Sequence, residues 1–390
     1  MRLLNTSTLE LHSFLSARHI DTPKYAILSH TWEDEEILFQ DVRDGPHTIP
    51  RDKKGFAKVA GSARYAKAKG FDWIWIDTCC IDKSSSAELS EAINSMFLWY
   101  RLAEICFAYL SDVRSPVEFA SSRWFTRGWT LQELIAPLEV EFLNSDWKLL
   151  GNRKGLAGSL SGITGVDERL LAGDSFITAY SISTRMAWAS HRQTSREEDL
   201  AYSLLGIFNV TMPLIYGEGL QSAFRRLQEE IIETSGDQSI FAFRQYYWKK
   251  NGSPRHVVAN PMTHYLASHP IYFGKGENII DDDPYERNHT ALHPITLHPH
   301  GVTFRAIVGP ATYHLNEKTS MKTQLVILNC CFQNDPLARP AFLVADFDGL
   351  LARLKSPLLR ALPSPGEGVI SVQSKGWGPG PGPEGEKARG

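Results

Sequence analysis

Residues 127–137 read Arg127-Gly-Trp-Thr-Leu-Gln-Glu133-Leu-Ile-Ala-Pro137. This stretch predicts a short helix that begins after a tryptophan, ends at a proline and carries one carboxylate, Glu133, in its first turns. Residues 103–112 before it are apolar and end in polar side chains, as a buried strand does, and residues 138–144 after it predict another strand. An acid between two such strands is expected near the end of a parallel sheet, where ligands usually bind. Glu133 is therefore the first candidate functional residue.

The composition is that of an ordinary soluble globular protein. The chain has 390 residues, of which 43% are hydrophobic and 22% charged. A net charge of −3 gives no general reason to expect binding to nucleic acid or to an anionic membrane. No apolar run approaches the length of a membrane span, and the start, MRLLNTSTLELHSF, lacks the apolar core of a secretory signal. We therefore expect a cytoplasmic protein.

The cysteines do not form a disulfide framework or a metal site. There are five: the adjacent pairs Cys79-Cys80 and Cys330-Cys331, and Cys106. They lie in apolar segments, as reduced thiols in a cytosolic core would, and adjacent cysteines lack the C-x-x-C spacing of metal ligands. His289, His293, His298 and His300 lie near acidic residues 281–283, but their spacing fits no standard metal site. We expect no bound metal.

The first part of the chain alternates strand and helix signals. Strands are predicted at residues 25–28, 72–78, 103–110 and 138–144, and helices at 58–69, 86–101 (capped by Ser86) and 129–136. Near-continuous apolar strands separated by helices predict a parallel sheet that helices cover on both faces. The expected fold class is therefore α/β.

The rest of the chain changes character twice. From residue 151 to about 235 it is helical, with apolar residues at three- and four-residue spacing in 179–190, 197–208 and 219–234. Residues 245–355 predict a small, mostly β appendage with strands near 256–259, 301–308, 323–332 and 340–347. Residues 360–390 form a Gly/Pro-rich tail that we expect to be disordered.

Several ordered blocks resemble the heterokaryon incompatibility (HET) domain of filamentous fungi. They are Tyr25-Ala-Ile-Leu-Ser-His-Thr-Trp32, Trp75-Ile-Asp-Thr-Cys-Cys-Ile-Asp-Lys83, SEAINSMFLWY at 90–100, RWFTRGWTLQELIAP at 123–137, EDLAYSLLGIF at 198–208, PLIYGEG at 213–219 and AFRRLQ at 223–228. The resemblance implies a HET domain over residues 1–240, with an α/β core at about 20–150 and a helical extension at about 151–235. It also implies a role in programmed cell death on non-self encounter and in fungal innate immunity.

The HET domain is in turn similar to TIR domains, whose fold is a flavodoxin-like parallel sheet. Enzymatic TIR domains carry a Trp-Cys-x-x-Glu-Leu motif and cleave NAD with its glutamate. The matching run here is Trp129-Thr-Leu-Gln-Glu133-Leu134, in which Thr130 replaces the cysteine. This more distant resemblance implies that Glu133 is catalytic and that NAD is a substrate, with no resident cofactor.

Polar residues follow each predicted strand of the sheet. Ser29, His30 and Trp32 follow the first strand, Asp77 closes the second, and Ser111 and Asp112 close the third. Arg127 precedes the helix of Glu133. Because the carboxyl ends of parallel strands share one edge, these residues are expected to converge on a crevice. The candidate ligand-binding residues are therefore Ser29, His30, Trp32, Asp77 and Arg127.

One carboxylate is enough for the implied reaction. Ordinary glycosidases need a second one to protonate an alcohol leaving group. Nicotinamide leaves NAD as a neutral pyridine from a cationic ring, so the remaining task is to stabilise an oxocarbenium-like ribose. The alternative is that Glu133 caps a backbone or pairs with Arg127 or Arg123.

The other candidates also have structural alternatives. Trp32 could stack on an adenine or nicotinamide ring, although a tryptophan after a buried strand more often belongs to the core. His30 could contact phosphate or ribose, or be a satisfied structural residue. Arg127 could face a pyrophosphate or form a surface salt bridge, and Asp77 could bind a ribose hydroxyl or cap the following turn.

Two functions from different classes follow. The first is an NAD-hydrolysing effector that kills the cell. The second is a non-enzymatic module that self-associates and signals to an incompatibility partner, in which case Glu133 is structural. The isosteric change Glu133→Gln discriminates between them, because only the enzyme needs the carboxylate.

Overall fold

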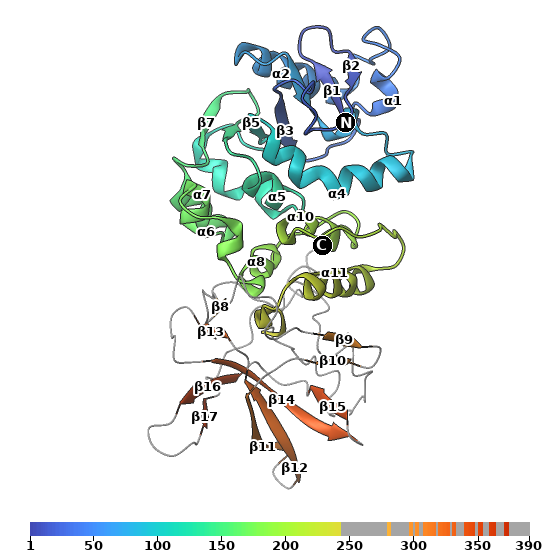
Figure 1. Ribbon diagram of the computed structural model, residues 1–390. Coiled ribbons are helices and arrows are strands. Elements are labelled where there is room, and N and C mark those ends of the chain that lie inside the picture. The colour runs from blue at the N-terminus through green and yellow to red at the C-terminus, as the bar shows by residue number, and fades with distance from the viewer. Residues whose placement is uncertain are drawn as a thin grey trace, which may run out of the picture.

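The computed structural model describes residues 1–242 throughout, and beyond them only strands, at 279–281, 296–298, 301–303, 307–316, 319–327, 330–332, 339–347, 350–353, 359–363 and 370–373. A seven-stranded sheet organises the N-terminal part, in the order β2-β1-β4-β3-β5-β6-β7 (Figure 1). Its strands are β1 (Arg2–Asn5), β2 (Leu11–Ser13), β3 (Ala26–His30), β4 (Trp73–Trp75), β5 (Ile105–Tyr109), β6 (Val140–Leu143) and β7 (Leu149–Asn152).

The centre of this sheet is parallel and the edges are antiparallel. Strand β3 pairs in parallel with β4 and β5, and β5 pairs in parallel with β6. These four strands lie in the sheet in the order β4-β3-β5-β6. If they are renumbered 1 to 4 along the chain, that order is 2-1-3-4, which is the start of the flavodoxin-like order. The α/β prediction is therefore confirmed. The order reverses between β3 and β5, so the carboxyl ends of these two strands form the switch point where ligands bind in such sheets.

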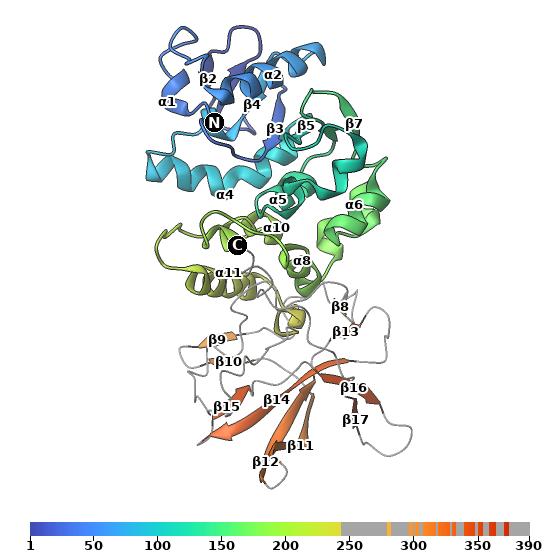
Figure 2. The same cartoon turned by 180° about the vertical axis from the view of Figure 1, so that it is seen from behind.

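The central strands are buried on both faces because helices cover them. Every residue of β3 is buried, and so are Ile74 and Trp75 of β4. Helix α2 (Lys54–Ala68) connects β3 to β4, and α4 (Ser86–Leu102) lies between β4 and β5. The connection from β3 to β4 and the connection from β4 to β5 run in opposite directions across the sheet. Because both are expected to be right-handed, α2 and α4 lie on opposite faces of the sheet (Figures 1 and 2).

The structure corrects several element boundaries. Asp77 does not close a strand: it begins the short helix α3 (Asp77–Cys80), because β4 ends at Trp75. The cap of α4 is Ser85 rather than Ser86, and its side chain accepts a hydrogen bond from the Glu88 amide. Strands β1, β2 and β7 were not predicted, since three- and four-residue strands leave too little alternation to detect.

Helices and short turns make up the remainder of residues 1–242. They are α1 (Phe39–Val42), η1 (Pro116–Ser121), η2 (Arg123–Thr126), α5 (Thr130–Ile135), α6 (Ala157–Thr164), α7 (Glu168–Ala172), η3 (Ile177–Ala179), α8 (Ile182–Ala189), α9 (Asp199–Tyr202), α10 (Leu205–Phe208), α11 (Leu220–Thr234) and η4 (Gln238–Phe241). The single helix predicted at 197–208 is two helices, α9 and α10. None of the helices in these described residues is long and apolar enough to cross a membrane.

One apolar core runs through both the α/β sheet and the helical extension. It includes Phe107 and Phe142 of the sheet as well as Trp188 and Phe224 of the extension. The two parts therefore do not have separate cores, although the sequence changes character near residue 151. Their junction is continuous packing rather than a linker.

The described C-terminal residues are strands, as predicted for the appendage. They are β8 (Ile279–Asp281), β9 (Thr296–His298), β10 (Gly301–Thr303), β11 (Ile307–Asn316), β12 (Thr319–Ile327), β13 (Cys330–Phe332), β14 (Arg339–Phe347), β15 (Leu350–Arg353), β16 (Leu359–Pro363) and β17 (Ile370–Gln373). Strands β16 and β17 fall where the disordered tail was expected to begin, because short apolar runs there still pair as strands. The predicted strand at 256–259, residues 376–390 and most of the His289–His300 region lie outside the described residues.

Candidate functional site

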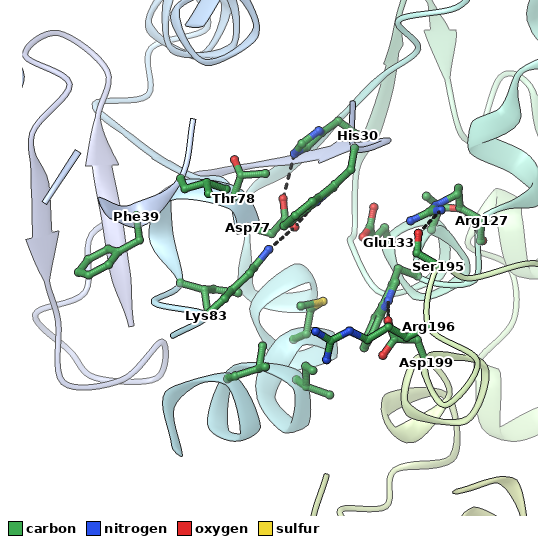
Figure 3. Close-up of a pocket in the computed structure, with 18 of the residues that line it drawn as sticks. His30, Phe39, Asp77, Thr78, Lys83, Arg127, Glu133, Ser195, Arg196 and Asp199 are labelled. Atoms are coloured by element: carbon green, nitrogen blue, oxygen red, sulfur yellow. Dashed lines mark hydrogen bonds and ion pairs between the residues drawn. The ribbon is translucent and has the colours of Figure 1, made fainter. Parts of the chain in front are cut away.

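A cavity of about 430 Å³ opens between the α/β sheet and the helical extension (Figure 3). One wall comes from the sheet edge and from α3, α4 and α5. The other comes from residues 195–199 and from Tyr216. The size falls within the range of small-molecule sites in proteins. The apolar part is lined by Leu38, Phe39, Ile81, Leu89, Ile93 and Met96, and the polar part by His30, Asp77, Lys83, Arg127, Glu133, Ser195, Arg196 and Asp199.

Glu133 borders this cavity from the first turn of α5. It is 7% exposed, and one of its carboxylate oxygens, Oε2, accepts a hydrogen bond from the Ser29 hydroxyl. The Ser29 hydroxyl accepts a hydrogen bond of 2.8 Å from Trp124 Nε1 in turn. Ser29 is fully buried behind Glu133 and does not line the cavity. In this geometry Ser29 contacts the Glu133 carboxyl group from the side away from the cavity.

The environment of Glu133 favours its protonated form. Burial is the main cause, and the charge of Asp77 adds to it. Hydrogen bonds from Ser29 and Tyr100 and the positive charge of Arg127 act in the opposite direction, and the net result raises the pKa of Glu133 to about 8. A strongly shifted carboxyl group in a cavity is the usual signature of a functional acid or base, although buried structural networks shift pKa values too.

Neither pairing proposed as the structural alternative for Glu133 is present. Arg123 forms an ion pair with Glu33 at 2.7 Å, and that pair does not line the cavity. Arg127 donates a hydrogen bond of 3.2 Å to the Ser195 hydroxyl. Among the described residues, Glu133 takes part in no ion pair within 4 Å. Its carboxyl group therefore remains available to a ligand in the cavity.

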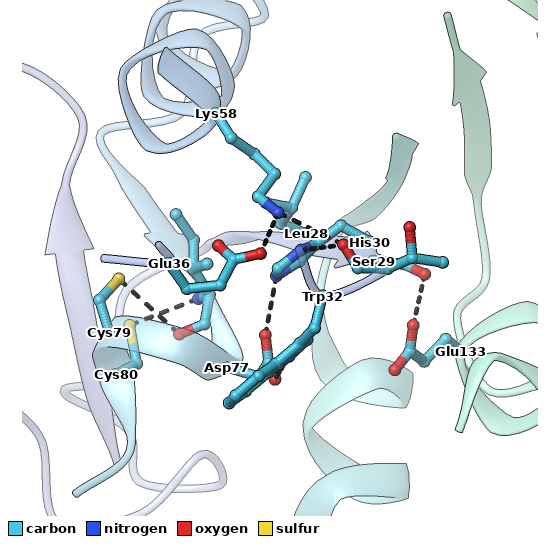
Figure 4. Close-up of polar contacts among 12 residues, drawn as sticks. Leu28, Ser29, His30, Trp32, Glu36, Lys58, Asp77, Cys79, Cys80 and Glu133 are labelled. Atoms are coloured by element: carbon cyan, nitrogen blue, oxygen red, sulfur yellow. Dashed lines mark hydrogen bonds and ion pairs between the residues drawn. The ribbon is translucent and has the colours of Figure 1, made fainter. Parts of the chain in front are cut away.

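Asp77 also lines the cavity and is the centre of a second polar cluster (Figure 4). His30 Nε2 lies 2.9 Å from Asp77 Oδ1, Trp32 Nε1 donates to Oδ2 over 2.7 Å, and Lys83 Nζ lies 3.3 Å from Oδ2. Burial alone would raise the pKa of Asp77, but Lys83, His30 and Trp32 outweigh it and hold the pKa well below its usual range. These three neighbours therefore favour the ionised form of Asp77, and Asp77 holds them in place.

Trp32 is not a core residue. Its side chain is 41% exposed at the cavity, and the Lys83 ammonium lies 3.6 Å from the centre of its ring. The expectation that this tryptophan belongs to the core is wrong, because the chain leaves the sheet after His30 and turns Trp32 toward Asp77. Lys83 covers one face of the indole, and the hydrogen bond to Asp77 holds the ring in place at the cavity.

The loop that carries Trp32 is anchored from behind by a buried ion pair. Lys58 on α2 pairs with Glu36, and both side chains are at most 6% exposed. Lys58 Nζ also lies 3.3 Å from the Thr31 carbonyl, and Glu36 accepts a 2.8 Å hydrogen bond from the Glu33 amide. These contacts fix residues 31–36 on both sides of Trp32 (Figure 4). His30, buried and bound to Asp77, has the contacts of a satisfied structural residue while it also borders the cavity.

The wall from the helical extension was not predicted from the sequence. Tyr216 donates a 3.0 Å hydrogen bond to Asp199 Oδ1, and Trp129 Nε1 donates to Oδ2 over 3.3 Å. Burial raises the pKa of Asp199. The Arg196 guanidinium lies 4.2 Å from the centre of the Tyr216 ring. The blocks EDLAYSLLGIF and PLIYGEG, which contain Asp199 and Tyr216, were a signal that could have pointed to this wall.

Backbone contacts join the two walls at Gly128. The Gly128 amide donates to the Gln193 carbonyl over 2.8 Å, and the Gln193 amide donates to the Thr126 carbonyl over 2.7 Å. Buried Arg192 adds hydrogen bonds to the Arg127 carbonyl at 2.8 Å and to the Thr130 hydroxyl at 3.0 Å. The extension is thus attached directly beside the helix that carries Glu133.

No group of three or more His, Cys, Asp or Glu side chains within residues 1–242 could hold a metal ion. Cys79, Cys80 and Cys106 are buried free thiols, as the sequence suggested. The side chains of His289, His293, His298 and His300 lie outside the described part of the structure.

Comparisons with known proteins identify two regions of the chain. Residues 25–116 match the family described as heterokaryon incompatibility protein (HET), and residues 222–338 match a domain of unknown function (DUF8212). The chain is 47% identical over 227 residues to the vegetative incompatibility protein HET-E-1 of Podospora anserina. That alignment covers 55% of this chain and 16% of the relative, so the chain spans about a sixth of the length of that protein. No solved structure matches the chain.

Proposed function

We propose that this chain, which carries a fungal HET domain, is an effector of heterokaryon (vegetative) incompatibility that triggers programmed cell death by hydrolysing NAD at the nicotinamide–ribose bond. The name of the similar Podospora protein supports the first part, because it is a vegetative incompatibility protein. The proposal includes a cytoplasmic location, self-association of the effector and an incompatibility partner that activates it.

The observation that carries the enzymatic part is the position of Glu133. It is a buried carboxyl group without an ion pair among the described residues, it lies beside the switch point of a flavodoxin-like parallel sheet, and it borders a cavity of about 430 Å³. Ligands bind at this place in open α/β sheets. Glu133 also lies in the run that resembles the motif of NAD-cleaving TIR domains.

The reaction needs only one carboxylate. Water adds at C1′ of the ribose, the bond from C1′ to the nicotinamide nitrogen breaks, and its electron pair leaves with the ring. The products are ADP-ribose, neutral nicotinamide and one proton. The positive charge moves from the ring to the ribose in the transition state, where a carboxylate next to C1′ stabilises it. Glu133 is assigned that role, and the Ser29 hydroxyl keeps its carboxyl group oriented.

The raised pKa of Glu133 couples ligand binding to proton release. At neutral pH the empty site holds Glu133 protonated, since its pKa is about 8. A cationic nicotinamide ring beside the carboxyl group lowers that pKa, because an opposite charge favours ionisation. The positively charged nicotinamide ring thereby favours ionisation of Glu133 to the carboxylate that stabilises the transition state. We expect kcat/KM for NAD to rise with pH up to about 8 and then to level off.

The test is nicotinamide release from NAD by the purified full-length chain, compared with Glu133→Gln. Gln keeps the shape of the side chain and a carbonyl oxygen for Ser29 but cannot ionise. We expect release by the wild type, with activity at least 100-fold lower in the variant, since a charge that acts on the transition state is typically worth that much. The proposal fails if Glu133→Gln, folded and tested at the same concentration, releases nicotinamide at the wild-type rate.

A self-associating signalling module is the second candidate function. An exposed apolar loop favours it: Leu15 is 82% and Ile20 is 94% exposed. If assembly alone kills the cell, Glu133→Gln keeps its toxicity and Leu15→Ser with Ile20→Ser abolishes it. The enzymatic proposal requires instead that Glu133→Gln abolishes toxicity.

A further inference from the structure

We infer that Arg127, Ser195 and Arg196 form a diphosphate-binding subsite in the polar half of the cavity, so that the helical extension supplies part of the ligand contact. The inference rests on the proposed function in one respect: the diphosphate is taken to be the bridge between the two nucleosides of NAD. The binding of ADP-ribose, which does not require catalysis, tests it separately.

The three side chains reach the same part of the cavity from two distant segments. Arg127 follows η2 beside the helix of Glu133, whereas Ser195 and Arg196 belong to the extension. Arg127 Nη1 donates to the Ser195 hydroxyl over 3.2 Å, which brings both polar groups to one place (Figure 3). Arg196 is held over the ring of Tyr216, whose hydroxyl is bound to Asp199.

The charges in the cavity favour an anionic ligand. Lys83 is neutralised by Asp77 at 3.3 Å, and Glu133 is uncharged at neutral pH. Arg127 and Arg196 take part in no ion pair within 4 Å among the described residues, although Asp199 lies near Arg196. Two guanidinium groups and one Asp199 carboxylate line this part of the cavity, which leaves an excess of positive charge. Guanidinium groups bind phosphate oxygens in a bidentate manner, and Ser195 adds a hydroxyl donor.

The backbone at the junction brings Arg127 and Ser195 together. An ideal Cβ on Gly128 would lie 2.5 Å from Thr194 Cγ2, so only glycine lets the segment before Ser195 come this close. The hydrogen bonds between Gly128 and Gln193 then fix the spacing of Arg127 and Ser195. This close approach explains why the motif around Glu133 has a glycine next to its arginine.

The order of the groups along the cavity matches the order of groups in NAD. Glu133 and Arg127 both line the cavity, and the charge of Arg127 acts to lower the pKa of Glu133. A nicotinamide ribose at Glu133 is followed directly by the diphosphate, which then meets Arg127, Ser195 and Arg196. We therefore expect the site to require the diphosphate and to discriminate against nicotinamide riboside, which lacks it.

The experiment is calorimetric titration of the full-length chain with ADP-ribose, with adenosine as the phosphate-free probe. Arg127→Met and Arg196→Met keep the alkyl part of the side chain and remove its charge. Arg123→Met is the matched control, since Arg123 is an exposed arginine of the same segment that binds Glu33 outside the cavity. Melting temperatures of all three variants check their folding.

We expect each cavity variant to bind ADP-ribose at least 10-fold more weakly, with Arg123→Met and adenosine binding unchanged, since charge-assisted hydrogen bonds are worth that much. No binding of ADP-ribose by the wild type, unchanged binding in Arg127→Met or Arg196→Met, or an equal loss in Arg123→Met overturns the subsite.

The two proposals fail in different ways. If ADP-ribose binding depends on the arginines but NAD is not cleaved, the subsite stands and the hydrolase proposal falls. If NAD is cleaved and Arg196→Met leaves KM unchanged, the hydrolase proposal stands and the subsite falls.

Discussion

Glu133 shows how a single buried side chain can combine function with a cost in stability. Its carboxyl group binds Ser29, which binds Trp124, so the group has a defined orientation. The same burial makes ionisation unfavourable, which is why the pKa rises to about 8. A structural carboxyl group would be expected to have a cationic partner. Glu133 takes part in no ion pair among the described residues, so its ionised form is disfavoured until a cationic ligand is bound beside it.

The pKa of Glu133 predicts how Glu133→Gln changes stability with pH. The folded protein keeps the proton up to about pH 8, whereas the unfolded chain loses it near 4.5. The wild type therefore loses stability as pH rises between these values, and Gln escapes this loss. We expect the variant to be close to the wild type at pH 5 and more stable at pH 9, by on the order of 4 kcal/mol in the free energy of unfolding.

Urea denaturation at pH 5, 7 and 9 measures this difference. Glu91→Gln on the exposed face of α4 is the control, because it removes a solvated carboxylate by the same substitution. A difference between Glu133→Gln and the wild type that stays constant from pH 5 to pH 9 would show that Glu133 ionises freely in the folded protein.

At the scale of elements, the short segment from η2 to α5 positions most of the site. Its arginine, Arg127, reaches the cavity, its glycine admits the extension, and its helix presents Glu133. Arg192 closes the junction from the other side and is itself buried, which lowers its pKa to about 9. The segment around Glu133 is thus as much a docking element for the extension as a candidate catalytic segment.

Gly128→Ala tests the junction. The added Cβ would lie 2.5 Å from Thr194 Cγ2 and 3.3 Å from Ser203 Oγ, so the extension must shift away from α5. We expect a loss of about 1–3 kcal/mol in the free energy of unfolding, as for other overpacked sites. ADP-ribose binding should weaken as well, because Ser195 and Arg196 move with Thr194.

Gly162→Ala is the control for this substitution. Gly162 lies inside α6 with nothing within 4 Å of an ideal Cβ. Alanine there is expected to stabilise the protein by up to about 1 kcal/mol, since it favours the helix. Equal melting temperatures for the Gly128 and Gly162 variants would show that the junction is looser than the backbone contacts indicate.

At the scale of the whole molecule, the α/β sheet and the extension behave as one folded unit. They share one apolar core, and the candidate cavity has walls from both. The change from strand-rich to helical sequence near residue 151 marks a change of architecture, not a domain boundary. A ligand in the cavity would bind both parts at once and stabilise their junction.

This continuity predicts the result of cutting the chain. A fragment of residues 1–152 loses the partners of its buried junction and is expected to aggregate or to lack a cooperative melting transition. Residues 1–242 retain the core and should unfold in one transition. Circular dichroism and calorimetry of the two fragments measure this, and a soluble 1–152 fragment that melts cooperatively would contradict the shared core.

The sequence by itself determined the α/β class and the succession of the central strands and helices along the chain. It also identified Glu133, Asp77 and His30 as candidate residues at one edge of the sheet. These features depend on apolar periodicity and chain order, which are properties of short segments. Only the tertiary structure decided that Trp32 faces the cavity, that Ser29 lies behind Glu133, and that Lys83, Ser195, Arg196 and Asp199 complete the walls. It also decided the antiparallel edges of the sheet. The physical reason is that these features arise where segments distant in the chain pack together, and local pattern does not encode which surfaces meet.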